Sequence, residues 1–331
     1  MRATVRDVAR RAKVSPKTVS NVVNGTFPVS PETRARVEAA LRDLDYVPNL
    51  SARGLRNGRT GVIALALPDL STSYSASITR AFVQAAGRRQ LSIQIEESAG
   101  SHEREAQLLS RARAQLVDGL VLNPVLLETS ALQPGVELPP VVMIGEVDQP
   151  AVDHLWYDNV AALHELTQLL LDEGHRRIAL LGRLPSASYR LRAQGYHEAM
   201  HAAGLEADPV LDIAVSGWTA AAGADAVRQY LAGHPLPDAI LCCTDTLAMG
   251  ALNALWDGGY RVPDDVSVTG YDDIPEAAFT IPPLTTVQVD PTAMAEQALE
   301  LLARRIADPT HPRSSTTLPH RIVRRQSTRP R

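Results

Sequence analysis

Apolar residues near the start of the chain recur every three or four positions, the spacing of helices that bury one face. They form three groups: Val5, Val8, Ala9 and Ala12; Val19, Val22 and Val23; and Val37, Ala40, Leu41 and Leu44. Each group begins at a capping signal: Thr4 with Asp7, Ser15 before Pro16, and Ser30 before Pro31. Two short helices across a tight turn, closed by a third, predict a helix-turn-helix head.

From residue 61 onward, short apolar runs alternate with longer amphipathic stretches. The strand-like runs are GVIALALP, LSIQIEE, GLVLNP, RRIALLG, residues 210–215, AILCCTD and VSVTGYDD. The helix-like stretches span about 75–89, 103–115, 188–203, 218–232 and 246–258. Repeated strand–helix–strand units form parallel sheets covered by helices. The pattern therefore predicts an all-α head followed by an α/β, two-lobed body with two parallel, doubly wound sheets.

Charge is distributed unevenly between these two parts. Residues 1–60 hold 12 Lys/Arg against 5 Asp/Glu, whereas the rest of the 331-residue chain holds 21 against 32. A basic head on an acidic body is typical of a small nucleic-acid-binding module joined to a domain that binds no polyanion, with chance clustering of surface charge as the alternative. The second predicted helix carries a polar face suited to phosphates and base edges. That face consists of Lys17, Thr18, Ser20, Asn21 and Asn24.

Composition also argues against a membrane protein, a secreted protein and a metalloprotein. No apolar run approaches the length that crosses a bilayer, and the first residues lack the apolar core of a secretory signal, so we expect a cytoplasmic protein with no membrane partner. A transport-type binding protein would carry such a signal instead of a basic head. Cys242 and Cys243 are adjacent and offer no metal-ligand spacing. We expect buried thiols there, and neither a metal nor a cofactor elsewhere.

The chain lacks most motifs that mark the common enzyme classes. The first strand is not followed by G-x-G-x-x-G, and the chain contains no Walker A sequence and no nucleophile elbow. Residues 197–201 read HEAMH, which matches the H-E-x-x-H pattern of zinc proteases. No downstream residue has a recognised third-ligand spacing, so we interpret HEAMH as a solvated helix face. The chain is expected not to be an enzyme.

Longer motifs make the interpretation specific. The head reads TVRDVARRAKVSPKTVSNVVNG and then VSPETRARVEAALRDLDYVPNLSARGLRNGRTGVIAL. The body contains GHRRIALLG, RLRAQGYHEAM, VPDDVSVTGYDDIPEAAF and PPLTTVQVD. These stretches resemble the bacterial regulators of the lac and purine repressor family (LacI/GalR) through essentially the whole chain. The resemblance implies a periplasmic-binding-protein-like body and a repressor that binds operator DNA.

For DNA recognition, the resemblance places Pro16, Lys17 and Asn21 at base-reading positions. Thr18, Ser20 and Asn24 fall where family members contact phosphates. Lysine can donate to guanine and asparagine can pair with adenine, whereas proline offers only apolar contact. The segment 49–56 resembles the hinge helix of the family, in which Leu55 matches a leucine wedged into the minor groove and Ala52 and Arg53 match its neighbours.

For the effector, the resemblance places a small molecule in the cleft between the lobes, at the carboxyl ends of the strands. Arg192 matches the ligand-binding arginine of the family, and Trp218 matches an aromatic residue that lines the cleft. The other candidates at strand ends are Tyr74, Thr244, Asp245 and Asp272. An arginine fork, a carboxylate and aromatic faces suit a sugar or a nucleoside. A structural role, such as helix capping, is the alternative for each of these residues.

The resemblance also suggests boundaries and assembly. We expect a helix-turn-helix domain over 1–47, a hinge helix and linker over 48–60, and an effector-binding and dimerisation domain over 61–331. The lobes would comprise about 61–157 with 289–317, and about 158–288 with 318–331. The tail, HRIVRRQSTRPR, lacks the leucine heptads of a tetramerising coiled coil, which favours a homodimer, and its arginines are expected to be solvated.

Overall fold

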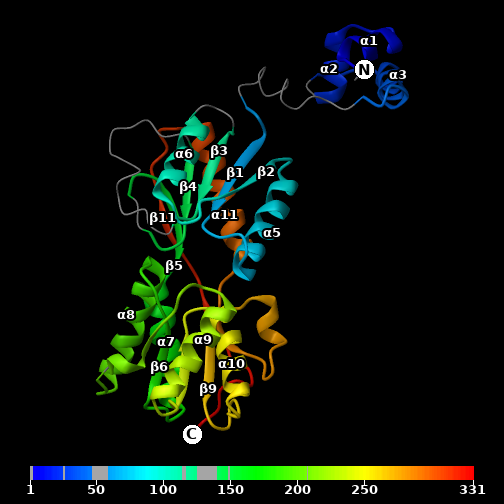
Figure 1. Ribbon diagram of the computed structural model, residues 1–331. Helices are drawn as coiled ribbons and strands as arrows, with labels where there is room; N and C mark the ends of the chain where they lie inside the picture. Colours follow the sequence, from blue (N-terminus) through cyan, green and yellow to red (C-terminus); the bar gives the residue numbers. More distant parts are fainter. Residues whose placement is uncertain are drawn as a thin grey trace. The chain divides into compact units, whose positions relative to one another are not determined.

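The computed structural model describes residues 3–24, 27–46, 59–113, 117–124, 140–147, 150–206 and 208–331. The chain divides into two compact units, Met1–Thr60 and Gly61–Arg331. We call them the head, which is blue in Figure 1, and the body.

The head consists of helices α1 (Val5–Ala12), α2 (Pro16–Asn24) and α3 (Pro31–Asp43). Thr4 caps α1 in a reciprocal pair: its hydroxyl accepts from the Asp7 amide, and the Asp7 carboxylate accepts from the Thr4 amide at 2.9 Å. Seven small apolar residues from all three helices form a separate core, which consists of Val8, Ala9, Ala12, Val19, Val22, Val37 and Ala40. The predicted helix-turn-helix fold is confirmed, and its helices pack through the predicted valine face.

The first lobe of the body, lobe N, contains a six-stranded sheet in the order β11-β5-β4-β3-β1-β2. The strands are β1 (Val62–Leu67), β2 (Ser92–Glu97), β3 (Gly119–Leu122), β4 (Val141–Ile144), β5 (Asp153–Tyr157) and β11 (Ser315–Leu318). They pair in parallel. Helices α5 (Ser73–Arg88), α6 (His102–Arg113) and α11 (Pro291–Ala307) cover the sheet (Figure 1).

Strand β1 explains why this lobe has helices on both faces. Successive side chains of a strand point to opposite faces. Ile63, Leu65 and Leu67 belong to one buried cluster with residues of α5 and α11, whereas Ala64 and Ala66 belong to another with residues of α6. A continuous apolar run is therefore required in β1, because neither of its faces meets water.

The second lobe, lobe C, contains a sheet in the order β12-β10-β9-β8-β6-β7. The strands are β6 (Ile178–Arg183), β7 (Asp212–Ala214), β8 (Ala239–Cys242), β9 (Ser267–Asp272), β10 (Thr285–Gln288) and β12 (Arg321–Val323). All pairs are parallel except β10 with β12. The helices are α7 (Asn159–Asp172), α8 (Ala187–Ala202), α9 (Ala220–Gly233) and α10 (Asp245–Asp257), with short 3-10 helices η1 (Pro209–Leu211) and η2 (Pro275–Ala278). The predicted fold class is confirmed.

Glycine allows the helices of lobe C to pack in close pairs. A Cβ atom at Gly195 of α8 would lie 2.1 Å from the carbonyl oxygen of Val160 in α7. A Cβ atom at Gly250 of α10 would lie 2.0 Å from the carbonyl oxygen of Ala220 in α9. Any side chain at these two positions would collide with backbone, so the helix pairs α7–α8 and α9–α10 depend on glycine at their crossing points.

The chain passes between the two sheets three times: from β5 to α7, from β10 to α11 and from β11 to β12. The apolar pattern did not predict β4, β5, α7, α11 or the last three strands. Strand β10 shows one reason, since its sequence TTVQ is not an apolar run. Thr285 and Thr286 are nevertheless buried, because their hydroxyls bond to Thr328 and to Asp245.

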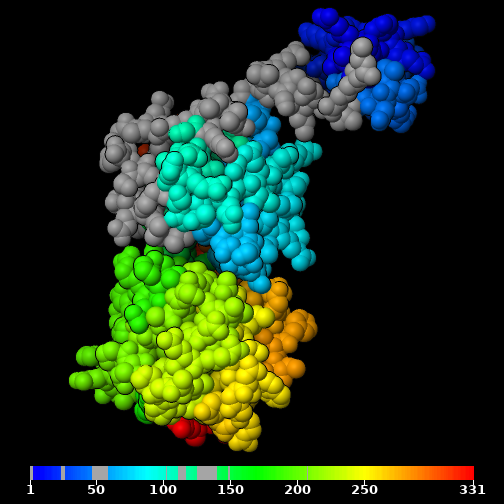
Figure 2. All heavy atoms as spheres, in the orientation of Figure 1, coloured from blue at the N-terminus to red at the C-terminus, as the bar shows by residue number. Residues whose placement is uncertain are grey.

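Several arginines of the C-terminal tail pair with acids of lobe C, yet Arg324, Arg329 and Arg331 keep more than half of their side-chain surface exposed, as predicted, whereas Arg325 is mostly covered. Arg324 pairs with Glu173, Arg325 with Asp273 at 2.6 Å, Arg329 with Asp264 at 2.5 Å, and Arg331 with Asp238. The last residues are red at the end of lobe C in Figure 2. The fold thus places an acidic partner opposite each of these four arginines.

Candidate DNA-binding face and effector site

Helix α2 presents its first turn to solvent. The Ser15 hydroxyl accepts a hydrogen bond from the Thr18 amide at 3.1 Å, which caps the helix. Pro16 and Lys17 in this turn are exposed, whereas Val19 is fully buried against the head core. The apolar back of the helix is thus used for packing, and its amino-terminal end is the part available to a partner.

The other residues predicted to contact DNA are either half-buried or outside the residues that the structure describes. Thr18, Ser20 and Asn21 are half-buried along α2. The side chain of Asn24 lies outside the described residues, as do Ala52, Arg53 and Leu55. The structure therefore brings the predicted base-reading residues Pro16, Lys17 and Asn21 onto one short helix, and it does not describe the predicted hinge contacts.

In the body, Arg192 lies where the lobes meet. Its side chain is buried in α8, and its Nε donates to Asn159 Oδ1 at 2.7 Å. Its Nη1 donates to the carbonyl oxygen of Cys243, at the carboxyl end of β8. Its Nη2 is 3.8 Å from Oε1 of Glu146, which follows β4 of lobe N. One guanidinium therefore connects a strand end of lobe C with a strand end of lobe N.

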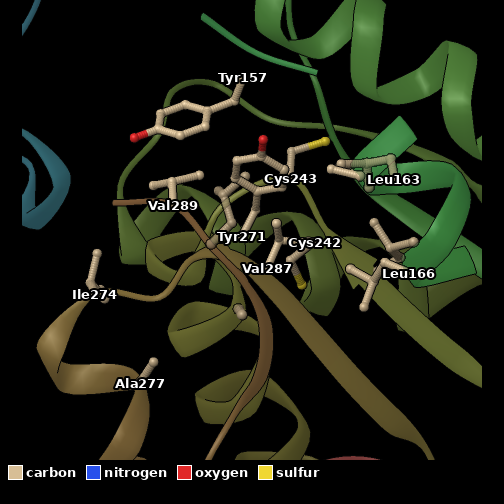
Figure 3. Packing of buried hydrophobic residues seen from close by; sticks show 14 of the residues in the cluster. Tyr157, Leu163, Leu166, Cys242, Cys243, Tyr271, Ile274, Ala277, Val287 and Val289 are labelled. Carbon is tan, nitrogen blue, oxygen red and sulfur yellow. The ribbon is translucent and has the colours of Figure 1, made fainter. Parts of the chain in front are cut away.

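The Arg192 guanidinium also stacks on an aromatic ring, since its Cζ lies 3.7 Å from the centre of the Tyr271 ring. Figure 3 shows Tyr271 and Cys243 in the upper part of the lobe C core, with Tyr157 of lobe N above them. Burial acts to lower the pKa of Arg192, but the neighbouring Tyr271, Asp272 and Glu146 raise it overall. Arg192 is therefore a permanent cation at this junction.

Asp272 is the predicted carboxylate beside Arg192. Burial raises its pKa well above the usual aspartate range, and the positive charge of Arg192 acts in the opposite direction. Its backbone has φ +110° and that of Asp273 has φ +51°, both in a region that non-glycine residues rarely adopt. Strained backbone conformations of this kind cluster at functional sites, where surrounding contacts hold them in place.

The predicted aromatic residues are Tyr74 of lobe N and Trp218 of lobe C. Tyr74 in the first turn of α5 is half-buried, and its pKa is raised well above the usual value by burial and then by Glu146, Tyr157, Asp272 and Tyr271. Tyr74 of lobe N therefore shares an electrostatic environment with Glu146, Asp272 and Tyr271. Trp218 precedes α9 and is partly buried against the lobe core.

The last two predicted effector residues have structural partners at the start of α10. The Thr244 hydroxyl accepts from the Leu247 amide at 3.1 Å and caps the helix. Asp245 is fully buried, where its carboxylate accepts from the Ile274 amide at 2.9 Å and from the Thr286 hydroxyl at 2.5 Å. These bonds join α10, η2 and β10 and thereby support the turn that follows Asp272.

Glu146 and Asn159 are residues of this cluster that the sequence analysis missed. Asn159 also donates to the carbonyl oxygen of Tyr157 at 2.9 Å, and it begins α7 at the first crossing between lobes. A signal for Glu146 does exist in the sequence, because it follows the apolar run VVMI after a single glycine. For Asn159 the sequence offered none, since its role depends on contact with α8.

Other features of the body do not form part of this cluster. Surface hollows of about 630 Å³ on α7 and about 540 Å³ on α5 are lined by none of the predicted effector residues. His197, Glu198 and His201 are exposed on α8, as the interpretation of HEAMH expected. Across the residues that the structure describes, no cluster of His, Cys, Asp and Glu is suited to a metal. In the same part of the chain no helix has the length and apolar character needed to cross a membrane.

Comparisons with known proteins identify both parts of the chain. Residues 4–49 match the bacterial regulatory proteins of the lacI family, and residues 167–328 match a periplasmic binding protein-like domain. The ribose operon repressor of Escherichia coli (strain K12) is 35% identical over 317 residues, which cover 93% of this chain and 94% of that protein.

Two solved structures extend the likeness over nearly the full length. The lac repressor dimer bound to operator and the anti-inducer ONPF is 30% identical, with a TM-score of 0.84 and 99% of both chains covered. The transcriptional regulator CelR in complex with cellobiose is 32% identical, with a TM-score of 0.72, and the match covers 98% of this chain and 100% of that chain.

Proposed function

The chain belongs to the lacI family of bacterial regulatory proteins and is a DNA-binding transcriptional regulator, and we propose that it is a dimeric repressor controlled by a hydroxyl-rich effector. Two heads related by a two-fold axis read a pseudo-palindromic operator, because the symmetry of the protein must match that of the site. The operator-bound dimer of the lac repressor, a structural relative, supports this assembly.

In each head, the first turn of α2 enters the major groove. Lys17 donates to guanine or to phosphate, Asn21 pairs with adenine, and Pro16 makes apolar contact. Thr18, Ser20 and Asn24 bind the phosphate backbone, which sets the register of the helix. Between the heads, Leu55 of each chain inserts into the minor groove, with Ala52 and Arg53 beside it, and kinks the central base step.

The effector binds between the lobes. The observation that carries this proposal is the Arg192 cluster, in which one buried guanidinium from lobe C meets Glu146 of lobe N beside Asp272. Tyr74 and Trp218 provide apolar faces for a sugar ring, and Thr244 and Asp245 hold the strand ends in place. The names of the ribose operon repressor and of the CelR–cellobiose complex favour a sugar.

Binding at this junction changes the relation of the two lobes, and so the spacing at which the two hinge segments meet DNA. A ligand shifts such an equilibrium only by its difference in affinity for the two states. Because the cluster draws on both lobes, a ligand there binds the two arrangements unequally.

Operator selection tests the DNA-binding proposal. The full-length protein selects sites from random duplex DNA at near-physiological salt, with and without a panel of sugars and nucleosides. We expect a two-fold symmetric site whose centre is an easily kinked step. Enrichment of a single asymmetric half-site would refute the dimeric proposal, and no enrichment under any condition would refute the regulatory one.

The effector proposal is tested on the selected operator with Arg192→Lys, which keeps the charge but removes the planar fork. We expect operator affinity to stay within about threefold of wild type, while the effector response is lost. Arg190→Lys is the matched control, because Arg190 is exposed on the same helix. A normal response in Arg192→Lys would remove Arg192 from the site.

A further inference from the structure

Glu146 brings a carboxylate from lobe N to the cation of lobe C without being firmly bonded to it. Its Oε1 lies 3.8 Å from Arg192 Nη2 and 3.5 Å from Asn159 Nδ2. Both separations are longer than a good hydrogen bond. The Glu146 side chain also keeps 19% of its surface accessible, compared with 6% for Arg192. The carboxylate therefore retains capacity to accept a hydrogen bond from a ligand.

Two of the three guanidinium nitrogens of Arg192, unlike the Glu146 carboxylate, have close hydrogen-bond partners in the protein. Nε is bonded to Asn159, and Nη1 uses one of its two N–H groups for the carbonyl oxygen of Cys243, so both nitrogens already have a protein acceptor. The third, Nη2, faces Glu146. A ligand that accepts from Nη2 therefore does so in the immediate presence of a carboxylate.

A hydroxyl group satisfies both partners, because it accepts through its lone pairs and donates through its hydrogen. One ligand hydroxyl can therefore accept from Arg192 Nη2 and donate to Glu146. A phosphate or carboxylate oxygen at neutral pH only accepts, so it would face Glu146 with no proton to share. Hydrogen-bond chemistry at this point thus distinguishes a hydroxyl from an oxyanion.

Surrounding charges favour the same choice. Asp158, which caps α7, contributes to the electrostatic environment of Tyr271, on whose ring the Arg192 guanidinium stacks. Arg325 does not add to the positive charge, because it is paired with Asp273 at 2.6 Å. Among the described residues named here, Glu146 therefore offsets the charge of Arg192, and an incoming anion would lose most of the attraction that the guanidinium alone would provide.

We propose that Glu146 is a specificity-determining residue, which makes the effector site select an uncharged, hydroxyl-bearing ligand over the phosphate ester of the same ligand. This inference rests on the effector site proposed above. It assigns a function to a residue of lobe N, namely discrimination by charge, in addition to the binding function of Arg192.

The test uses pairs of neutral and phosphorylated probes with the full-length protein. The pairs are D-ribose with D-ribose 5-phosphate, D-glucose with D-glucose 6-phosphate, and adenosine with adenosine monophosphate, and inorganic phosphate alone is an anion control. Isothermal titration calorimetry gives the dissociation constant of each probe for wild type, Glu146→Gln and Glu198→Gln. Glu198 is exposed on α8, so its variant controls for the loss of one negative charge.

We expect wild type to bind the neutral member of at least one pair, and to bind its phosphate ester at least about tenfold more weakly. Glu146→Gln keeps an acceptor oxygen and adds a donor, so the neutral probe stays within about threefold while the discrimination falls by about tenfold. Glu198→Gln leaves the ratio unchanged. Glu146→Ala, with the melting temperature as a check of folding, should lose the same discrimination.

The proposal is overturned if wild type prefers a phosphate ester, or if Glu146→Gln keeps the wild-type ratio of the two dissociation constants. It is also overturned if neither wild type nor Glu146→Gln binds any probe. Operator selection separates this failure from failure of the proposed function. An operator found together with unchanged ratios refutes the role of Glu146 alone, whereas failure to enrich any operator refutes the regulator itself.

Discussion

Asp245 offers the sharpest quantitative test of the body fold, because it is a fully buried carboxylate with two neutral donors and no described ion-pair partner. Its oxygens accept from the Ile274 amide and the Thr286 hydroxyl, and a Cβ atom at Gly270 would lie 2.1 Å from Oδ1. Burial raises the pKa of Asp245 to about 7, from a reference value of 3.8. We therefore predict that Asp245→Asn changes how the stability of the body depends on pH.

The direction in which the stability changes with pH follows from the raised pKa of Asp245. The folded protein holds the Asp245 proton more tightly than the unfolded chain, so the stabilisation is complete below the unfolded pKa, near 4, and is lost as pH rises through about 7. At 1.36 kcal/mol per pKa unit, ionisation costs about 4 kcal/mol of unfolding free energy by pH 8. Asparagine has nearly the same shape and does not titrate, so the variant avoids this cost.

The assay is urea unfolding between pH 4.5 and 8, monitored by tryptophan fluorescence. All three tryptophans, Trp156, Trp218 and Trp256, belong to the body, so the signal reports this unit. Relative to wild type, Asp245→Asn should gain stability progressively as pH rises, by about 4 kcal/mol at the upper end. Near pH 4.5 the two proteins should differ by about 1 kcal/mol or less.

Asp225→Asn serves as the control, since Asp225 is exposed on α9 and its variant should follow the wild-type pH profile. Parallel profiles for Asp245→Asn and wild type would refute the reasoning, because they would mean that Asp245 has the same pKa in the folded and unfolded states.

Three further predictions concern packing and DNA binding. Gly250→Ala should destabilise the body by about 2 to 3 kcal/mol, because its Cβ would collide with the backbone of α9. Gly233→Ala, whose Cβ would have no atom within 4 Å, should have little effect, and urea unfolding compares the two variants. Lys17→Ala should weaken operator binding by roughly 1 to 3 kcal/mol, measured by fluorescence anisotropy, and equal loss on random DNA would assign Lys17 to phosphate rather than base contact. Leu55→Ala, outside the described residues, should lose most specific binding while nonspecific binding persists, and an unchanged operator affinity would contradict the wedge.

Local sequence signals were sufficient to predict those helices and strands whose structure depends mainly on their own residues. The three head helices were predictable because each begins at a cap and carries apolar residues at helical spacing, as in Thr4 with Asp7 and the valines of α2. Strand β1 was predictable for a related reason, since both of its faces are buried and its composition must be apolar throughout. Strand β10 was not, because its buried threonines depend on partners distant in sequence.

The candidate effector site divides in the same way. Arg192, Tyr74, Trp218, Thr244, Asp245 and Asp272 were named from sequence by their motifs and by their position at predicted strand ends. Sequence did not separate Asp245, whose oxygens are occupied by Ile274 and Thr286, from Asp272 beside Arg192. The difference lies in which element packs over each carboxylate, and that is set by contacts between segments far apart in the chain.

The sequence by itself determined the head, the alternation of strands and helices in the body, and the family to which the chain belongs, because periodicity, caps and motifs are local properties. Only the tertiary structure decided that Glu146 of lobe N meets Arg192 of lobe C and that arginines of the tail pair with acids of lobe C. Their physical reason is the same: an ion pair depends on distance in space, and three crossings between the lobes bring together residues that no local pattern relates.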